Sequence, residues 1–122
     1  MNIKSDANCK SSDVIYAARC KICNLLYIGE TKDKISNRFS KHRYDTHKRP
    51  DNCDLAKHMS QENHDFDRDL DIFVLEGNFK SDEERKFQED RYICLLGTLS
   101  PSGMNTKQED YCKEMYGLHQ SI

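Results

Sequence analysis

Hydrophobic residues along this chain follow two different periods, and the changes between them mark out strands and helices. Two short runs rich in β-branched and aromatic residues, within 13–19 and 25–30, have the composition of strands. A third run of this kind spans 70–75 and is closed by the pair Gly77-Asn78. The pattern therefore predicts a three-stranded sheet whose first two strands form a hairpin.

Between the second and third strands, apolar residues return at helical spacing. Ile35, Phe39 and His42 share one face of a helix that is expected to run to about residue 47. The segment 49–52, which contains a proline, ends this helix and can cap a second, shorter one. The second helix is expected to turn three residues inward: Leu55, Ala56 and Met59.

A last long helix follows the third strand. Ser81 with Glu84 three residues later fits a capping box at its start. Gly97 ends the helix in the usual manner of a C-cap. The residues expected on its buried side are Phe87, Ile93 and Leu96.

A chain of 122 residues favours one domain rather than several. We expect an α/β domain over 13–106, in which helices flank an antiparallel sheet, with a flexible lead-in at 1–12 and a helical tail at 107–122. Apolar residues make up 36% and charged residues 33% of the chain, so the core is modest and the surface strongly charged. No stretch approaches the roughly 20 apolar residues of a membrane span, so we expect no membrane partner.

Charge is unevenly distributed along the chain. The net charge of −2 argues against a tight, free-standing DNA binder, because phosphate neutralisation needs a basic surface. Basic residues nevertheless gather between 32 and 49, whereas acidic residues gather in 65–71 and 82–90. One face can therefore bind phosphate while the chain as a whole stays acidic.

Six cysteines raise the question of disulfides or metal. No apolar stretch follows Met1, so we expect a nuclear or cytoplasmic protein in a reducing compartment, where disulfides are rare. In that setting Cys20 and Cys23, which are separated by two residues, indicate a metal or redox motif. His58 and His64, late in the second helix and just past it, would complete a zinc-finger-like set with Zn²⁺ in a closed structural site.

Other assignments of the cysteines and histidines stay open. Cys53, His42 and His47 are competing metal ligands by residue type. The alternative without any metal is a pair of buried thiols and two surface histidines.

Two tyrosines, Tyr16 and Tyr27, stand eleven residues apart, in Val14-Ile15-Tyr16 and Tyr27-Ile28-Gly29. Arg38 and His42 follow on one helix face, Glu89 lies in the last helix, and the run from 96 to 105 ends in Asn105. In order and spacing, this set resembles the GIY-YIG nuclease family. The run 96–105 and the cysteine pair are similar to the branch found in Penelope-like retroelements, which carries a Cys-Cys-His-His zinc-binding insertion.

The resemblance implies a metal-dependent DNA endonuclease. By it, Tyr16 helps deprotonate the attacking water, Tyr27 orients water or phosphate, and His42 assists proton transfer. Arg38 would contact phosphate oxygens, and Glu89 would hold one Mg²⁺ or Mn²⁺ beside the leaving 3′ oxygen. Cations near Tyr16 are expected to lower the pKa of its phenol, as a general base requires. The expected substrate-binding residues are Lys41, Arg43 and Asn105, of which the last also closes the core.

The sequence departs from the family pattern at two positions. Val14 replaces the glycine that names the first motif, and Glu30 stands where some DNA-repair members carry a lysine. Taken singly, each candidate residue is common in strands, helix faces and turns, and only the joint order favours a nuclease. Two rival functions are a catalytically silent module for binding nucleic acid or protein, and a structural zinc protein without an active centre.

Overall fold

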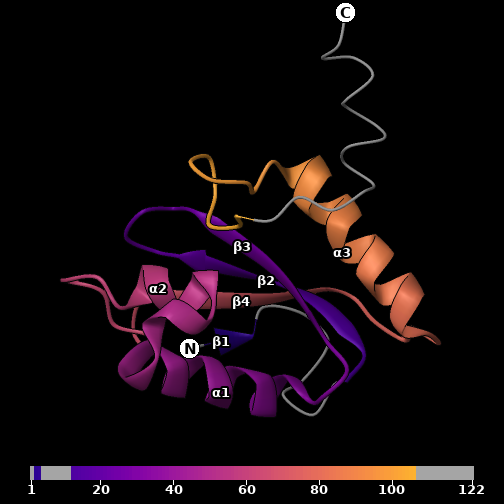
Figure 1. Cartoon of the computed structure of the whole chain (residues 1–122), viewed down its shortest axis with the longest axis horizontal. Helices are drawn as coiled ribbons and strands as arrows, with labels where there is room; N and C mark the ends of the chain where they lie inside the picture. Colours follow the sequence, from indigo (N-terminus) through magenta and orange to yellow (C-terminus); the bar gives the residue numbers. More distant parts are fainter. Residues whose placement is uncertain (1, 4–11, 107–122) are drawn as a thin grey trace, which may run out of the picture.

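The computed structural model describes residues 2–3 and 12–106. Along the chain the elements are β1 (Asn2–Ile3), β2 (Val14–Cys20), β3 (Leu26–Thr31), α1 (Ile35–Lys48), the 3₁₀ turn η1 (Pro50–Asn52), α2 (Asp54–Met59), β4 (Leu70–Glu76) and α3 (Asp82–Leu96) (Figure 1). The three expected strands and three expected helices are confirmed, although α2 ends at Met59, earlier than a helix that His64 directly follows. In this part of the chain, no helix has the length and apolar character needed to cross a bilayer.

The strands form one sheet in the order β1-β4-β2-β3. β2 pairs antiparallel with β3 on one side and with β4 on the other, so that Tyr16 lies opposite both Gly29 and Val74. This confirms the predicted three-stranded antiparallel core of the sheet. The α/β architecture flanked by helices is confirmed as well.

A fourth strand was not expected. Asn2 and Ile3, within the predicted flexible lead-in, pair in parallel with Asp71 and Ile72 of β4. An outer strand offers unpaired backbone groups, so even two residues of extended chain can pair with it. The rest of the predicted lead-in up to residue 11, and the predicted tail 107–122, lie outside the described residues.

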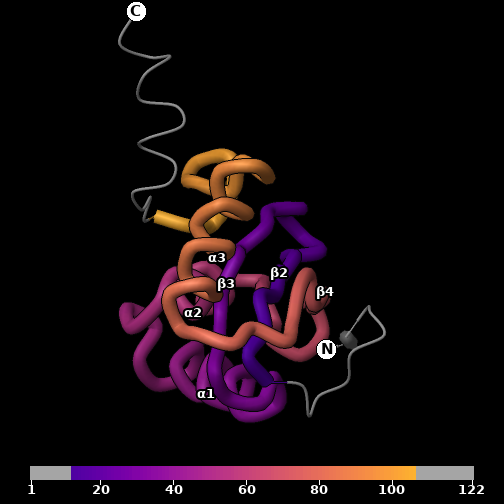
Figure 2. The backbone as a smooth tube through the Cα atoms, turned by 90° about the vertical axis from the view of Figure 1, so that its right-hand side faces the viewer, coloured from indigo at the N-terminus to yellow at the C-terminus, as the bar shows by residue number. Residues whose placement is uncertain are grey.

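The two faces of the sheet have separate cores. Tyr16, Ala18 and Cys20 of β2 point to the face covered by α1 and α2, where they pack with Phe39 and Leu55. Residues Ile15 and Ala17 alternate to the opposite face and pack with Ile28 and with Ile93 of α3. Figure 1 and Figure 2 show α1 and α3 on opposite sides of the strands. Alternate residues of β2 therefore pack against the same helices, α1 and α2 on one face and α3 on the other.

The burial of α3 corrects one prediction. Of the three residues expected to face inward, only Ile93 is buried, whereas Phe87 is 50% and Leu96 is 47% exposed. Buried Arg85 and Ile93 lie eight residues apart on the same face of the helix. Phe87 stands off that face, and Leu96 is the last residue before Gly97 turns the chain in a left-handed conformation. The apolar pattern alone therefore misjudged which side of α3 meets the sheet.

Arg85 anchors the start of α3 to the sheet. It is 4% exposed, and its guanidinium donates to Asp82 at 2.9 Å, to Asp13 at 3.2 Å and also to Glu30. These carboxylates belong to the first turn of α3, the entry to β2 and the end of β3. The ion pairs therefore fix α3 against the hairpin, one helical turn before Glu89.

Replacing Arg85 with methionine should destabilise the domain by roughly 3 kcal/mol, because the ion-paired carboxylates lose their buried partner. Urea unfolding would measure the loss. Lys86→Met, an exposed neighbour on the same helix, is the matched control and should leave the free energy of unfolding nearly unchanged. Equal stability of the Arg85→Met variant and the parent would show that the network does not anchor α3.

Candidate active site and metal centre

The candidate active site begins with Tyr16 at the middle of β2. Its side chain is fully buried and packs edge-on against Phe39, with the ring centroids 4.9 Å apart. A β-carbon on Gly29, the strand neighbour of Tyr16, would collide with the phenol ring. Glycine at this place in β3 is therefore required by the position of the Tyr16 ring.

Two side chains contact the hydroxyl of Tyr16, and the ring of Tyr27 lies nearby. The Nε2 atom of His42 lies 2.9 Å from the hydroxyl oxygen, and the Nε–H of Arg38 donates to the same oxygen at 3.4 Å. Arg38 and His42 are four residues apart on α1, as the sequence predicted. The ring of Tyr27 lies 6.3 Å from that of Tyr16 and 6.1 Å from that of His42. We refer to Tyr16, Tyr27, Arg38 and His42 as the tyrosine cluster.

Glu89 reaches this region from α3. Together with Tyr27 it lines a cavity of about 360 Å³, and its negative charge raises the pKa of both Tyr16 and Tyr27. Asp51 and Asp54 line the same cavity, so it offers oxygen ligands of the kind that Mg²⁺ prefers. The structure thus brings together all five residues that the sequence named as candidate catalytic groups.

The predicted substrate-binding residues lie in different surroundings. Lys41 is exposed on α1, and its charge reaches His42. Arg43 instead pairs with Asp67 at 2.7 Å, and its guanidinium lies 5.6 Å from the ring centre of Phe66. The structure therefore places Lys41 near the tyrosine cluster and pairs Arg43 elsewhere.

Asn105 is used mainly by the fold. Its Nδ2–H donates to the carbonyl of Ile28 at 2.9 Å, while its Oδ1 accepts from the N–H of Ile28 at 2.9 Å and from the hydroxyl of Thr98 at 2.8 Å. Both lone pairs of Oδ1 are thereby occupied, and one amide hydrogen remains. This is the arrangement expected for a residue that closes the core, and it leaves little of the side chain for a substrate.

The pKa values in the tyrosine cluster differ from the expectation. Burial raises the pKa of Tyr16 to about 12, and the neighbouring Arg38 only partly offsets this effect. Burial, with the charges of Arg38 and Lys41, lowers the pKa of His42 to about 3. Arg38 therefore lowers the pKa of Tyr16 as expected, but burial outweighs this effect and the net direction is upward. At neutral pH the cluster holds a neutral phenol beside a neutral imidazole.

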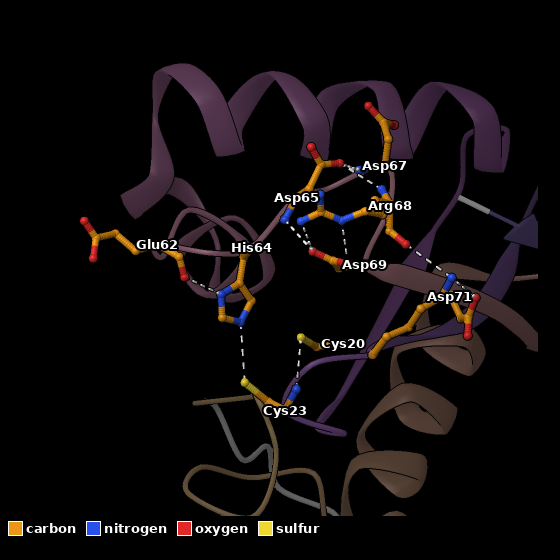
Figure 3. A network of polar contacts seen from close by, with 10 residues as sticks. Cys20, Cys23, Glu62, His64, Asp65, Asp67, Arg68, Asp69 and Asp71 are labelled. Atoms are coloured by element: carbon orange, nitrogen blue, oxygen red, sulfur yellow. Dashed lines mark hydrogen bonds and ion pairs between the residues drawn. The ribbon is translucent and has the colours of Figure 1, made fainter.

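A second cluster joins the two cysteines and the two histidines that the sequence singled out. One ligand atom from each of Cys20, Cys23, His58 and His64 lies within 4.8 Å of all the others. Cys20 ends β2, and Asn24 adopts a left-handed conformation with φ of 59° in the turn after Cys23. The Cys23 N–H faces the sulfur of Cys20 at 3.5 Å (Figure 3). The four side chains form a set that can hold a metal ion.

The histidine orientations fit a metal ligand set. His64 Nδ1 donates to the carbonyl of Glu62 at 3.0 Å, which leaves the Nε2 lone pair directed at Cys23, whose sulfur is 3.4 Å away (Figure 3). For His64, an acceptor on the other ring nitrogen fixes the tautomer in the way that metal sites require. His58 Nε2 is buried and has no hydrogen-bond partner among the described residues, and its Nδ1 lies 3.2 Å from Nε2 of Gln61.

The other thiols and histidines within the described residues are not part of this cluster. Among the described cysteines none is in a disulfide. Cys53 and His42, considered as competing ligands, lie together at the tyrosine cluster, with Sγ 3.4 Å from Nδ1. Sequence reasoning did not foresee this contact, nor the role of Arg85. The one available signal for the contact with His42 was that Cys53 is a thiol placed just before a helix.

The buried, neutral His42 should make stability depend on pH. Its pKa is lowered from 6.5 to about 3 on folding, so the unfolded chain binds a proton that the folded chain does not. Stability is therefore complete above the unfolded pKa and falls as the pH drops towards the folded value. Between pH 6.5 and 5 the parent should lose about 1.5 kcal/mol more than a His42→Gln variant.

Chemical unfolding at several pH values would measure this difference. His47→Gln, which changes an exposed histidine of the same helix, should keep the slope of the parent. If parent and His42→Gln lost stability in parallel, His42 would not be held neutral by burial.

Comparison with known proteins gives two solved structures with this fold. The catalytic domain of homing endonuclease I-TevI superimposes with a TM-score of 0.61 at 18% identity, over 78% of this chain and 98% of that one. A glutamate-to-alanine variant of the catalytic domain of intron endonuclease I-TevI gives 0.62 at 18% identity, over 79% and 94%. No family model and no curated protein matches the sequence. The likeness shows that the chain has the fold of a GIY-YIG catalytic domain.

Proposed function

We propose that this chain is a metal-dependent DNA endonuclease that hydrolyses a phosphodiester bond, as a nick or as part of a double-strand cut. The observation that carries the proposal is the contact of the Tyr16 hydroxyl with both His42 and Arg38, beside a cavity that Glu89 lines. The fold is shared with an endonuclease catalytic domain, which supports the same conclusion. At 18% identity this likeness shows the fold, and the geometry of the site supports the activity.

The geometry supports a proton relay through Tyr16. A phenol with a pKa of about 12 is not ionised at neutral pH, so Tyr16 can accept a proton from water only if it passes its own proton on. His42 Nε2, 2.9 Å away and neutral, can take that proton. The water's proton moves to Tyr16 as the Tyr16 proton moves to His42, and the hydroxide attacks phosphorus. A rate that rises with pH through tyrosine ionisation is therefore not expected.

Basic side chains of α1 would balance the negative charge of the phosphate. Arg38 lies beside Tyr16, and its guanidinium can donate two parallel hydrogen bonds to phosphate oxygens. Glu89 would hold a divalent cation, Mg²⁺ or Mn²⁺, which when bound supplies Lewis acidity at the leaving 3′ oxygen. Exposed Lys41 adds positive charge on the same helix as Arg38. These groups favour a polyanionic substrate such as DNA.

Purified protein should convert supercoiled plasmid to nicked or linear DNA with Mg²⁺ or Mn²⁺, and EDTA should stop the reaction. Tyr16→Phe keeps the ring but removes the proton acceptor, so cleavage should slow at least about a hundredfold. Arg38→Ala and Glu89→Gln should cause comparable losses. Gel-based rates at saturating enzyme would measure all three.

A matched control is Tyr92→Phe, which removes a half-buried hydroxyl of α3 that donates to Glu76 on the opposite face of the sheet. It should cleave at the rate of the parent. Thermal unfolding of each variant separates lost catalysis from lost fold. A Tyr16→Phe protein that nicks as fast as the parent contradicts the relay. A parent without divalent-dependent cleavage would favour the silent binding module.

We further propose that the cysteine–histidine cluster binds one structural Zn²⁺. Two thiolates and two imidazoles form a ligand set that tetrahedral zinc prefers, and the unpartnered Nε2 of His58 supports this assignment. With four protein ligands, no coordination position would be left for catalysis. A zinc-binding insertion and an origin in a Penelope-like or other mobile element rest on the sequence resemblance. A nuclear or cytoplasmic location also stays a prediction of the sequence.

Purified protein should contain about one zinc per chain by metal analysis. Cys20→Ser should lose the zinc and several kcal/mol of stability, because metal binding is coupled to folding. Cys94→Ser, a half-buried thiol of α3 outside the cluster, is the control and should keep the zinc. Stoichiometric zinc in a Cys20→Ser, Cys23→Ser double variant would exclude this ligand set.

A further inference from the structure

A thiol lies beside the ring nitrogen of His42 that does not face Tyr16. Cys53 precedes α2 as its N-cap, and its sulfur accepts the N–H of Ala56 at 3.4 Å. The same sulfur lies 3.4 Å from Nδ1 of His42, on the opposite side of that ring from Tyr16. The thiol also lines the cavity together with Tyr27 and Glu89. Cys53 therefore contacts His42 of the proposed proton relay at Nδ1, the ring nitrogen that does not face Tyr16.

The two contacts of His42 require one tautomer for the relay. A phenol is a stronger acid than the N–H of neutral imidazole, and an imidazole nitrogen is a better acceptor than a phenol oxygen. The Tyr16 hydroxyl is therefore the donor to Nε2, and the single ring proton of His42 sits on Nδ1. That proton points at the sulfur of Cys53.

The opposite tautomer would prevent the relay. With the proton on Nε2, His42 would donate to the Tyr16 oxygen, which already accepts from Arg38. Both lone pairs of the phenol oxygen would then be occupied, and none would remain for a proton from water. The acceptor on the far side of the imidazole thus decides whether Tyr16 can act.

We propose that Cys53 is a positioning residue for phosphodiester cleavage, whose sulfur accepts the Nδ1–H of His42 and so keeps Nε2 open towards Tyr16. This inference rests on the proposed function of the tyrosine cluster. It assigns Cys53 a role beyond capping α2, the helix that carries the candidate zinc ligand His58. When His42 gains the second proton, the same sulfur remains the acceptor of Nδ1–H, so the ring need not turn.

The first test reads the tautomer without any cleavage. Ring nitrogens of histidine have distinct ¹⁵N chemical shifts when protonated and when free, and a His42→Gln variant identifies the signals of His42. The parent should show a protonated Nδ1 and a free Nε2. Cys53→Ala should shift His42 towards the other tautomer or a mixture of both, whereas Cys53→Ser should preserve the parent pattern because the hydroxyl can accept from Nδ1–H.

Two further variants separate positioning from capping. Glycine is tolerated at N-caps at a cost of only a few tenths of a kcal/mol, so Cys53→Gly should fold even if Cys53→Ala is too unstable. It should show the same change at His42 as Cys53→Ala. Cys94→Ala removes a half-buried thiol from α3 and should leave the His42 signals unchanged. Unaltered His42 shifts in both Cys53→Ala and Cys53→Gly would overturn the proposal.

The second test follows cleavage. Cys53→Ala and Cys53→Gly should lower the single-turnover rate by about tenfold or more, as expected for a lost partner behind a functional histidine, with DNA affinity unchanged. Cys53→Ser should recover most of the rate. Equal rates in parent and Cys53→Gly would contradict the positioning role. If the parent does not cleave at all, the proposed function fails, while the ¹⁵N result still decides whether Cys53 sets the tautomer.

Discussion

The pairing of β2 with strands on both sides is the constraint on which both sites depend. Because β3 and β4 hydrogen-bond to its two edges, β2 cannot rotate, and its alternate residues are held to fixed faces. Tyr16 and Cys20 have the same parity and point towards α1 and α2. A shift of one residue in register would send both to the α3 side. The candidate active site and the candidate metal centre therefore lie at different points along the same face of β2.

The short helix α2 connects these two ends. It has six residues, too few to be stable alone, and it carries His58 of the metal cluster while Cys53 caps its start beside His42. A metal held by the hairpin and by α2 would therefore also fix the wall of the cavity that Cys53 and Asp54 form. A zinc ion bound there would support the candidate active site indirectly, by holding α2 in place.

Burial gives the tyrosine cluster its chemical character. The Tyr16 ring is enclosed by Phe39 and by the backbone of Gly29, so desolvation outweighs the nearby guanidinium and keeps the phenol protonated. The same burial keeps His42 neutral. A protonated donor beside an unprotonated acceptor can move a proton without either group carrying charge in the resting state. Desolvation thus keeps both groups uncharged at neutral pH.

Much of the fold followed from the sequence because local signals agreed with one another. The β-branched runs gave the strands, Ser81 and Gly97 marked the ends of α3, and the spacing of Arg38 and His42 placed them on one helix face. These features depend on near neighbours in sequence, where propensity and periodicity are informative. The candidate residues were grouped as one site by their resemblance to a family pattern, because they are distant from one another in the sequence.

Other features were decided by tertiary structure. The buried side of α3, the ion pairs of Arg85 and the contact of Cys53 with His42 join elements that are distant in sequence. The pKa of Tyr16 moved in the opposite direction from the one expected, because it depends on how completely other segments exclude water. The sequence by itself determined which groups are present and on which element each lies. Only the packing of those elements decided which groups touch and which remain charged, since burial is a property of the whole fold.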